Sequence, residues 1–437
     1  MSYTTLSIIS LALTLNLELI GQVNIQSGPM LGYNALNEAS IWVQLSDSAD
    51  VSIEFWESGK DITKSQLKPS FREMNETHIA TFVVSELSPG TSYYYNVLIN
   101  GEKQSFDSLL TFKTQELWHY RTDPPTTRVA LGSCTYINEA SYDRPGKPYG
   151  SDYKILERIA DMKPDAMIWL GDNIYLREYD YFTWKGYLHR YNHTRKTKEM
   201  QRLLRTTTNY AIWDDHDFGP NDANGSWIHK DWALDAFKLY WMNPSYGIPG
   251  VQGINTAFPI NDIHFFFLDN RYNRNSPDNK GVEPQILGKD QIEWLIEALK
   301  FSNAPFKLVA VGGQVLNPAK VYENHAQYPA ERKYLLERII EEKITGVVFL
   351  TGDRHHTELR KINVDDITIY DLTVSPLTSG VHSVVNEANE NLVEGTMISE
   401  HNFAILEFTG ERLSRQMKIS IFDKEGSEIW SRTINPK

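Results

Sequence analysis

The chain has 437 residues, of which 41% are hydrophobic and 12% aromatic, and its formal net charge is −13. This length exceeds one ordinary hydrophobic core, so we expect two domains. An acidic chain without a basic run is unsuited to binding nucleic acid through phosphate neutralisation, and its single cysteine excludes an intrachain disulfide.

The amino terminus carries a short apolar stretch at residues 6–15 (LSIISLALTL). Its length suits a signal peptide better than a membrane span, so residues 1–21 are predicted to direct export to the periplasm, the cell surface or the medium. No Lys or Arg precedes the stretch, and only Gly21 before Gln22 resembles a cleavage position. A mis-assigned start codon is one explanation for the missing basic residues. We expect no membrane span elsewhere.

Residues 25–115 are predicted to form a small all-β domain. Alternating apolar residues predict strands at 41–45 and 51–55, with a polar turn between them. The pattern Leu-x-Pro-Gly-Thr-x-Tyr-x-Tyr at 87–95 resembles the corner before a late strand in immunoglobulin-like and fibronectin type III sandwiches. We expect this domain to pack beside the catalytic domain without taking part in chemistry. The stiff linker at 122–127 (TDPPTT) marks the boundary.

From residue 128 to 437 the pattern alternates between strands and helices, which predicts an α/β domain. Six apolar runs, typical of strands buried on both faces, each end in polar residues that are able to bind metals. They lie at 128–134, 166–175, 210–217, 265–271, 307–314 and 347–356. Ligands gather beyond the carboxyl ends of strands, so these ends predict one metal-dependent active site. Helices are expected at about 151–162, 292–299 and 330–342, and closing antiparallel strands at 402–408 and 417–432.

The most specific motif runs from Gly171 to Tyr175 (GDNIY). The glycine lets the backbone turn off the strand, so that the Asp172 carboxylate is placed to bridge two cations. The tyrosine is placed to reach back as a phenolate, a hard anionic donor that requires a strong Lewis acid because tyrosine titrates near about 10. The alternative is a capped strand end with a core tyrosine. Cys134 is either a metal ligand or a buried structural thiol, and Ser133 beside it is expected to be a turn residue.

A second motif holds Asp214, Asp215, His216 and Asp217, followed by Asn221. These mostly anionic groups cannot all be buried without compensation. Paired carboxylates with an imidazole suit hard divalent cations and a transferring phosphoryl group. The alternative is a solvated acidic loop.

The third motif contains Asp353, His355 and His356. Adjacent side chains on extended backbone point in opposite directions, so only His355 is expected to face the metals. Gln314 offers a weak, neutral carbonyl ligand. Arg271 either binds a phosphate oxygen or forms an ion pair with Asp269. Four aromatic residues either line a pocket for an apolar or ring-bearing group or belong to a helix core, namely Trp227, Trp232, Tyr240 and Trp241.

In this order the motifs resemble the PhoD-like alkaline phosphatases of the metallophosphoesterase superfamily. Cys134 takes the place of the first Asp of the generic superfamily pattern, and Gln314 takes the place of a His. The segments 214–217 and 352–355 replace Gly-Asn-His-Asp and Gly-His-x-His, while 268–271 (LDNR) and 287–295 (LGKDQIEWL) add to the likeness. The resemblance covers nearly the whole chain. It implies a four-layer αββα metallophosphatase-type sandwich that follows an immunoglobulin/fibronectin-like domain.

The resemblance also implies a ferric ion held by Cys134, Asp172 and Tyr175, with Asp172 bridging to calcium; other divalent metals are open. The further implied ligands are Asp214, Asp215, Asn221, Asp353 and His355. The implied reaction is hydrolysis of small phosphodiesters and phosphomonoesters at alkaline pH, by in-line attack of a metal-bound hydroxide. The residues assigned to catalysis are His216, Arg271 and Asp172.

Two alternatives remain beside this function. One is a related hydrolase, such as a phospholipase D-like or nucleotide phosphodiesterase, which the motifs do not separate. The other is a non-catalytic binding scaffold. The intact Asp172, Tyr175, Asp215 and His355 argue against a scaffold, because a dead site has no physical need for clustered anions.

Overall fold

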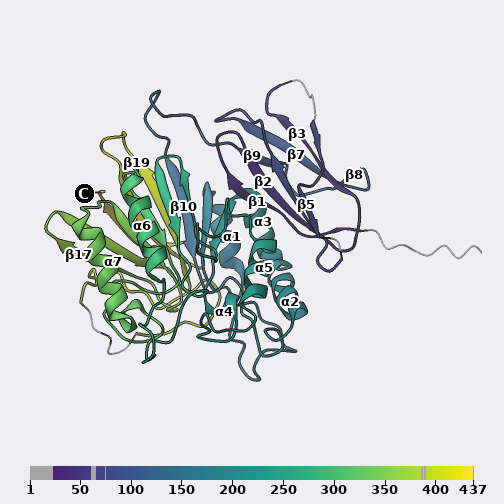
Figure 1. Ribbon diagram of the computed structural model, residues 1–437. Helices are drawn as coiled ribbons and strands as arrows, with labels where there is room; N and C mark the ends of the chain where they lie inside the picture. Colours follow the sequence, from purple (N-terminus) through teal and green to yellow (C-terminus); the bar gives the residue numbers. More distant parts are fainter. Residues whose placement is uncertain (1–22, 61–64, 74, 385–386, 388–389, 437) are drawn as a thin grey trace, which may run out of the picture.

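The computed structural model describes residues 23–436, apart from 61–64, 74, 385–386 and 388–389. The predicted signal peptide at 1–21 lies outside the described residues. Figure 1 shows a β-rich amino-terminal part at the upper right, joined to a larger α/β part. Among the described residues, no helix combines the length and apolarity needed to cross a membrane.

The amino-terminal part is built from strands that form two facing sheets. Its strands are β1 (Ile25–Asn34), β2 (Ala39–Leu45), β3 (Val51–Glu57), β4 (Ser65–Leu67), β5 (Phe71–Glu73), β6 (Ile79–Val84), β7 (Ser92–Ile99), β8 (Glu102–Lys103) and β9 (Leu110–Lys113). One sheet has the order β4-β3-β7-β8 with β9 paired to β7, and β1, β2, β6 and β5 belong to the other. Ile41, Phe82 and Val97 are among the residues of the core between them. The predicted all-β sandwich is therefore present.

The sheet that contains β1 continues into the rest of the chain. Its further strands are β10 (Thr127–Gly132), β11 (Ala166–Leu170), β12 (Thr208–Ile212), β19 (Asn402–Thr409), β20 (Gln416–Asp423) and β21 (Glu428–Ile434). The order is β21-β20-β19-β10-β11-β12-β1-β2-β6-β5, and β10, β11 and β12 are parallel. Leu31 of β1 pairs in parallel with Thr208 of β12. The amino-terminal sandwich thus shares a sheet with the α/β part, whereas the sequence predicted only that the two pack side by side.

A second sheet carries the other strands of the α/β part. They are β13 (Thr256–Ile260), β14 (Ile263–Phe267), β15 (Lys307–Ala310), β16 (Val347–Thr351), β17 (Glu358–Val364) and β18 (Ile367–Thr373). The order is β13-β14-β15-β16-β18-β17, with β14, β15, β16 and β18 parallel. Each of the six apolar runs predicted as strands therefore contains one, three in each sheet, and their carboxyl ends carry the predicted site residues.

Helices cover the outer faces of both sheets. They are α1 (Lys154–Asp161), α2 (Trp184–Arg195), α3 (Lys198–Thr206), α4 (Asp215–Phe218), α5 (Lys230–Tyr240), α6 (Lys289–Phe301), α7 (Pro329–Glu341) and the 3-10 helix η1 (His325–Gln327). Figure 1 shows α6 and α7 together at the left of the molecule, and α2, α3 and α5 toward the β-rich part. The α/β character predicted from the sequence is confirmed.

Alternating residues of the second sheet belong to two different cores. Phe265 and Phe267 of β14 lie in the core shared with the first sheet, together with Leu350. Phe266 lies in the core that contains Leu295 of α6. A strand buried on both faces needs apolar residues at every position, which explains the run Phe265–Phe267.

The aromatic residues after β12 belong to the helix core. Tyr240 and Trp241 are buried in the main core, and Trp227 and Trp232 pack against it. Of the two interpretations of these residues, the structure supports the helix core.

Candidate metal centre

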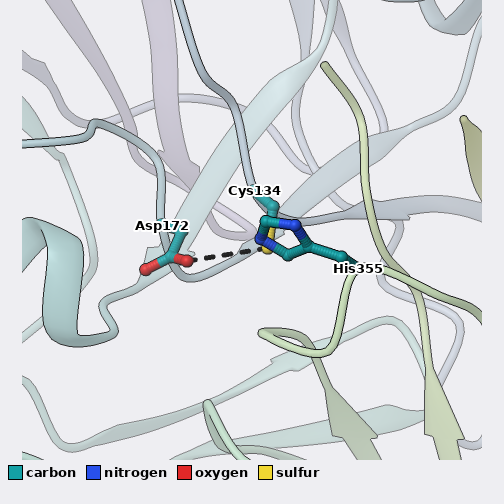
Figure 2. A group of neighbouring side chains, drawn as sticks. All are labelled: Cys134, Asp172 and His355. Atoms are coloured by element: carbon teal, nitrogen blue, oxygen red, sulfur yellow. Dashed lines mark hydrogen bonds between the residues drawn. The ribbon is translucent and has the colours of Figure 1, made fainter. Parts of the chain in front are cut away.

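The loops after β10, β11, β12 and β16 bring the predicted ligands together. In three overlapping groups, the possible ligand atoms lie within 4.8 Å of one another. The groups are Cys134–Asp172–His355, Asp172–Asp215–His216 and Asp214–Asp215–Asp353. Figure 2 shows the Cys134, Asp172 and His355 side chains pointing toward one another. A cavity of about 1080 Å³ opens beside them, and Asn221 lines it with Asp172, Asp215 and His355.

Four of these residues have left-handed backbone, which is uncommon for residues other than glycine. The φ angles are 61° at Cys134, 51° at Asp172, 67° at Asp353 and 55° at His355. Such conformations persist when the surroundings hold them, and they cluster at functional sites. Here the Cys134 N–H donates to Gly171 O at 3.2 Å, and the His355 N–H donates to Ser375 Oγ at 3.0 Å. These backbone turns therefore direct four side chains, each with a possible metal-ligand atom, toward the same part of the site.

The thiol of Cys134 is fully buried beside a carboxylate. Its Sγ lies 3.6 Å from Asp172 Oδ2, and Ser375 Oγ donates to it at 3.1 Å. Burial and the charge of Asp172 raise the pKa of the thiol well above its usual range. A thiolate at this position therefore requires a cation. Ser133 donates to Val374 O at 2.8 Å, as befits the predicted turn residue.

Two tyrosine hydroxyls flank the imidazole of His355. Tyr175 Oη lies 3.2 Å from His355 Nε2, and Tyr149 Oη lies 3.2 Å from Nδ1. Burial lowers the pKa of His355 to about 3, so the ring is neutral, which is the form that binds metals. Burial and the charge of Asp172 raise the pKa of Tyr175 well above its usual range. Like the thiol, this phenol becomes an anionic donor only beside a strong Lewis acid.

The carboxylates at this end of the site oppose one another's ionisation. Burial, followed by the charges of Asp215 and Asp214, raises the pKa of Asp172 well above its usual range. The pKa of Asp353 is raised in the same way. Among the described residues, Asp353 Oδ2 and Asp215 Oδ1 are buried oxygens without a hydrogen-bond partner. Buried anionic oxygens without partners fit bound cations, as do the accompanying thiol, phenol and imidazole.

Arg271 neutralises the neighbouring carboxylate Asp214. Its Nε donates to Asp214 Oδ1 at 2.6 Å, and its NH1 lies 2.6 Å from Glu323 Oε2. Asp269 instead accepts hydrogen bonds from backbone N–H groups, including that of Tyr272 at 2.8 Å. The predicted ion pair between Arg271 and Asp269 is therefore wrong, because the guanidinium is directed to Asp214 and Glu323.

Three residues of the acidic motif after β12, Asp215, His216 and Asp217, have different roles. Asp217 caps α4 and accepts the backbone N–H of Asn173 at 3.1 Å, so its role is structural. Asp215 faces the cavity; burial acts to raise its pKa, but His216 and Arg271 lower it to about 2. His216 lines the same cavity, with Nε2 4.0 Å from Asp215 Oδ2. The motif is thus built around compensated anions, and the alternative of a solvated acidic loop is wrong.

A glycine after β15 makes room for Asp214. A Cβ added at Gly312 would collide with Asp214 Oδ2 and with Asn270 Nδ2. Asn270 Nδ2 donates to Asp214 Oδ1 at 2.9 Å, so the two side chains and the Gly312 backbone pack as one unit. This close approach explains why a glycine follows the strand.

Two further sequence predictions have different outcomes. Gln314 donates to Glu358 Oε1 at 2.6 Å, and its own Oε1 accepts from Arg354 at 2.5 Å, so its amide serves a buried network rather than the metals. His356 lies 3.6 Å from Glu358 Oε2, and His355 joins the Cys134 group. His355 thus joins the cluster, but its φ of 55° is left-handed rather than extended as expected, and His356 also lines the larger cavity. That only His355 binds a metal stays a prediction.

Sequence reasoning missed several residues at the site. Glu323 pairs with both Arg271 and Arg274, and it forms a further acidic group with Asp215 and Asp222. No motif precedes Glu323, so only its place in the fold reveals it. Tyr149 lies in a Pro-Gly loop that carried no signal beyond the tyrosine itself.

Comparison with solved structures defines the class of the fold. A structure of PhoD superposes with a TM-score of 0.72 at 18% identity, covering 95% of this chain and 94% of that chain. A purple acid phosphatase from yellow lupin (Lupinus luteus) seeds gives a TM-score of 0.67 at 13% identity, covering 93% and 74%. The chain therefore has a metallophosphatase-like fold.

Sequence comparison finds a similarity to one family of phosphatases. The model of the PhoD-like phosphatases matches residues 252–413, and a domain of unknown function, DUF7800, matches residues 22–116. Alkaline phosphatase D of Bacillus subtilis (strain 168) is 25% identical over 362 residues, which cover 71% of this chain and 59% of that protein. The chain is therefore similar to the PhoD-like phosphatases. It spans 59% of the length of this curated relative.

Proposed function

We propose that this protein hydrolyses phosphate esters, both diesters and monoesters, at the cavity beside Cys134, Asp172 and His355. The observation that carries the proposal is the charge of the cluster. No ion pair reaches Asp172 or Asp353 among the described residues, although both are buried or nearly so beside other carboxylates. Buried anions without compensation are costly, and bound cations remove the cost.

The proposed ions are Fe³⁺ and Ca²⁺. Cys134, Asp172 and Tyr175 would hold the ferric ion, and Asp172 would be shared with calcium. The remaining donors are Asp214, Asp215, Asn221, Asp353 and His355. When bound, the metals supply Lewis acidity toward the phosphate oxygens and lower the pKa of bound water.

The chain's own residues position the ester and stabilise its charge. His216 lies at the cavity wall, so it is placed to donate to a phosphate oxygen as negative charge develops. Arg271 is buried and paired with Asp214, and it does not line the cavity. We therefore assign Arg271 the positioning of the carboxylates rather than direct contact with the phosphate.

The amino-terminal sandwich is proposed to be of the immunoglobulin or fibronectin type. The supporting contact is at the predicted corner, where the Ser88 N–H donates to Tyr93 Oη at 2.8 Å. A tyrosine that binds the backbone a few residues upstream is characteristic of such corners. Export also remains a proposal, resting on residues 6–15; amino-terminal sequencing of protein recovered from outside the cell would test it.

The function is tested by hydrolysis of bis-p-nitrophenyl phosphate and p-nitrophenyl phosphate at alkaline pH, before and after chelation. We expect activity that chelation removes and that iron with calcium restores. The control variant Asp366→Asn, an exposed carboxylate in the turn between β17 and β18, should behave as the wild type. Turnover of the monoester alone would restrict the protein to phosphomonoesters. No turnover of either ester by metal-loaded protein would favour the binding scaffold.

A further inference from the structure

A second cleft adjoins the metal cavity. Its volume is about 680 Å³, and it shares the lining residues Tyr149, His216 and Asn221 with the larger cavity. Its walls carry five tyrosines, namely Tyr136, Tyr142, Tyr149, Tyr175 and Tyr181. The two cavities therefore meet at the metal cluster, and the smaller one is walled by aromatic rings.

The rings form a continuous surface that leads outward from the cluster. Tyr175 lies 4.3 Å from the His216 ring and 5.0 Å from Tyr136, measured between centroids. Tyr136 in turn meets Tyr149 edge-on at 5.0 Å. Tyr149 is 43% exposed, so this surface reaches solvent. A ring entering the cleft would meet Tyr175, Tyr136 and Tyr149, and Tyr142 and Tyr181 also line the cleft.

A buried arginine holds the wall in place. The Arg177 guanidinium lies 4.1 Å from the centroid of the Tyr136 ring. It also donates to Asp143 Oδ1 and to Ile137 O, each at 2.8 Å. Tyr136 Oη donates to the same carboxylate oxygen at 2.8 Å. The cleft is thus preformed, which lowers the entropy lost on binding a ligand.

The mouth of the cleft carries positive charge in an otherwise acidic protein. Lys147 is exposed there and has no ion-pair partner among the described residues. Arg144 is 93% exposed and lies 3.7 Å from Glu178, a contact that solvent screens. The acid Asp143 is already engaged by Arg177. An anionic ester therefore meets cations at the entrance.

We propose that the tyrosine cleft binds a flat, unsaturated ring on the alcohol part of the substrate. This inference rests on the proposed function and narrows it to ring-bearing phosphate esters, of which nucleotides are the chemical model. Stacking of a base on an aromatic side chain contributes on the order of 1–3 kcal/mol, or roughly 5- to 150-fold in affinity. An aliphatic polyol ester lacks this contribution.

The test compares two esters that differ only in the ring. Adenosine monophosphate and methyl riboside monophosphate, esterified at the same primary hydroxyl, release alkoxides of similar basicity. Their methyl diesters extend the comparison to both ester classes. We expect kcat/KM to favour the adenosine ester by roughly tenfold. The double variant Tyr142→Leu/Tyr181→Leu should remove the preference, with the larger loss of kcat/KM on the adenosine ester. Tyr120→Leu, at a tyrosine that is 95% exposed outside both cavities, is the matched control.

A second measurement separates the cleft from the chemistry. Calorimetry with adenosine and methyl riboside reports ring binding without hydrolysis. Adenosine binding that the double variant loses supports the cleft, even if no ester turns over and the proposed function fails. Equal kcat/KM for the two esters, or no adenosine binding by the wild type, would overturn the ring subsite while leaving phosphate-ester hydrolysis standing. Benzyl phosphate against cyclohexylmethyl phosphate shows whether any flat ring suffices or a nucleobase is required.

Discussion

Two anionic regions at the strand ends differ in how their charge is compensated. Asp214 is neutralised within the chain, by Arg271 and by the amide of Asn270. Asp172, in the adjoining group with Cys134 and His355, has no such cation among the described residues. In the first region a cation of the chain itself offsets the charge, although among the described residues Asp214 Oδ2 has no hydrogen-bond partner. The second has no cation of the chain to offset its charge, which is why we place the proposed metals there.

The ionisation of Asp215, whose Oδ1 lies 3.8 Å from Arg271, contrasts with that of Asp172. Asp214 behaves differently, because burial raises its pKa in spite of Arg271. Burial acts to raise the pKa of Asp215, but His216 and Arg271 lower it to about 2. Burial and neighbouring carboxylates raise the pKa of Asp172 well above its usual range. The difference follows from His216 and Arg271 beside Asp215 rather than from burial, since both carboxylates are buried.

The largest effect is expected from removing the anion of the uncompensated region. Asp172→Asn should lower kcat/KM for bis-p-nitrophenyl phosphate by at least roughly a thousandfold, because it removes the carboxylate that we propose is shared by the two metals. The variant should fold normally, since it deletes a buried charge that nothing in the chain neutralises. Asp366→Asn serves as the control. Wild-type turnover in Asp172→Asn would remove the site assignment.

Removing the cation of the compensated region should instead lower the stability of the fold. Arg271→Met leaves Asp214 buried without its cation, and we expect the free energy of unfolding to fall by about 3–5 kcal/mol in urea denaturation. Adding Asp214→Asn should restore part of this loss, because the buried charge is then gone. A loss below about 1 kcal/mol would show that Asp214 is compensated in another way.

Cys134→Ser tests the thiolate ligand of the uncompensated region. A serine hydroxyl is a poor replacement for a thiolate, so iron content should fall by at least roughly tenfold, with turnover falling in parallel. Elemental analysis of the purified protein measures the first effect. Unchanged iron and unchanged turnover would mean that Cys134 is a structural thiol.

Asp215 and Asp172 should also make the stability of the metal-free protein respond to pH in opposite directions. Asp215 has a lowered folded pKa, so it contributes roughly 2 kcal/mol of stability above its unfolded pKa of about 3.9, and this is lost as the pH falls toward about 2. Asp172 has a raised folded pKa, so its ionisation costs stability as the pH rises above about 4.

Urea denaturation of chelated protein across this pH range measures the contributions of both carboxylates to the free energy of unfolding. Asp215→Asn should flatten the acid limb of the stability profile, and Asp172→Asn should flatten the loss toward neutral pH. Identical profiles of stability against pH for the two variants would contradict the contrast between Asp215 and Asp172.

Much of the candidate metal site could be predicted from the sequence, for a physical reason. Asp172, Asp215 and His355 each follow a continuous apolar run, and parallel strands bring their carboxyl ends to one edge. The left-handed backbone of Asp172 and His355 was signalled only by neighbouring glycines, Gly171 and Gly352.

The other features of the fold and the site depend on tertiary packing, and no local sequence pattern predicts them. Glu323 lies between β15 and η1 with no motif before it, yet it pairs with Arg271. The joining of β1 to β12 rests on one parallel register pair, Leu31 with Thr208, which neither strand's own sequence specifies. The alternative in which Arg271 forms an ion pair with Asp269 was wrong for the same reason. Asp269 is near Arg271 in the sequence, whereas Asp214, its partner in the structure, is distant in the sequence.

Metal content of the dialysed protein tests the central claim most directly. Elemental analysis of the wild type and Asp172→Asn, with hydrolysis of bis-p-nitrophenyl phosphate measured on the same samples, relates bound ions to activity. We predict that the wild type retains metal, that the variant loses it, and that turnover follows the metal content of each sample. Full turnover by wild-type protein shown to be free of metal would contradict the account.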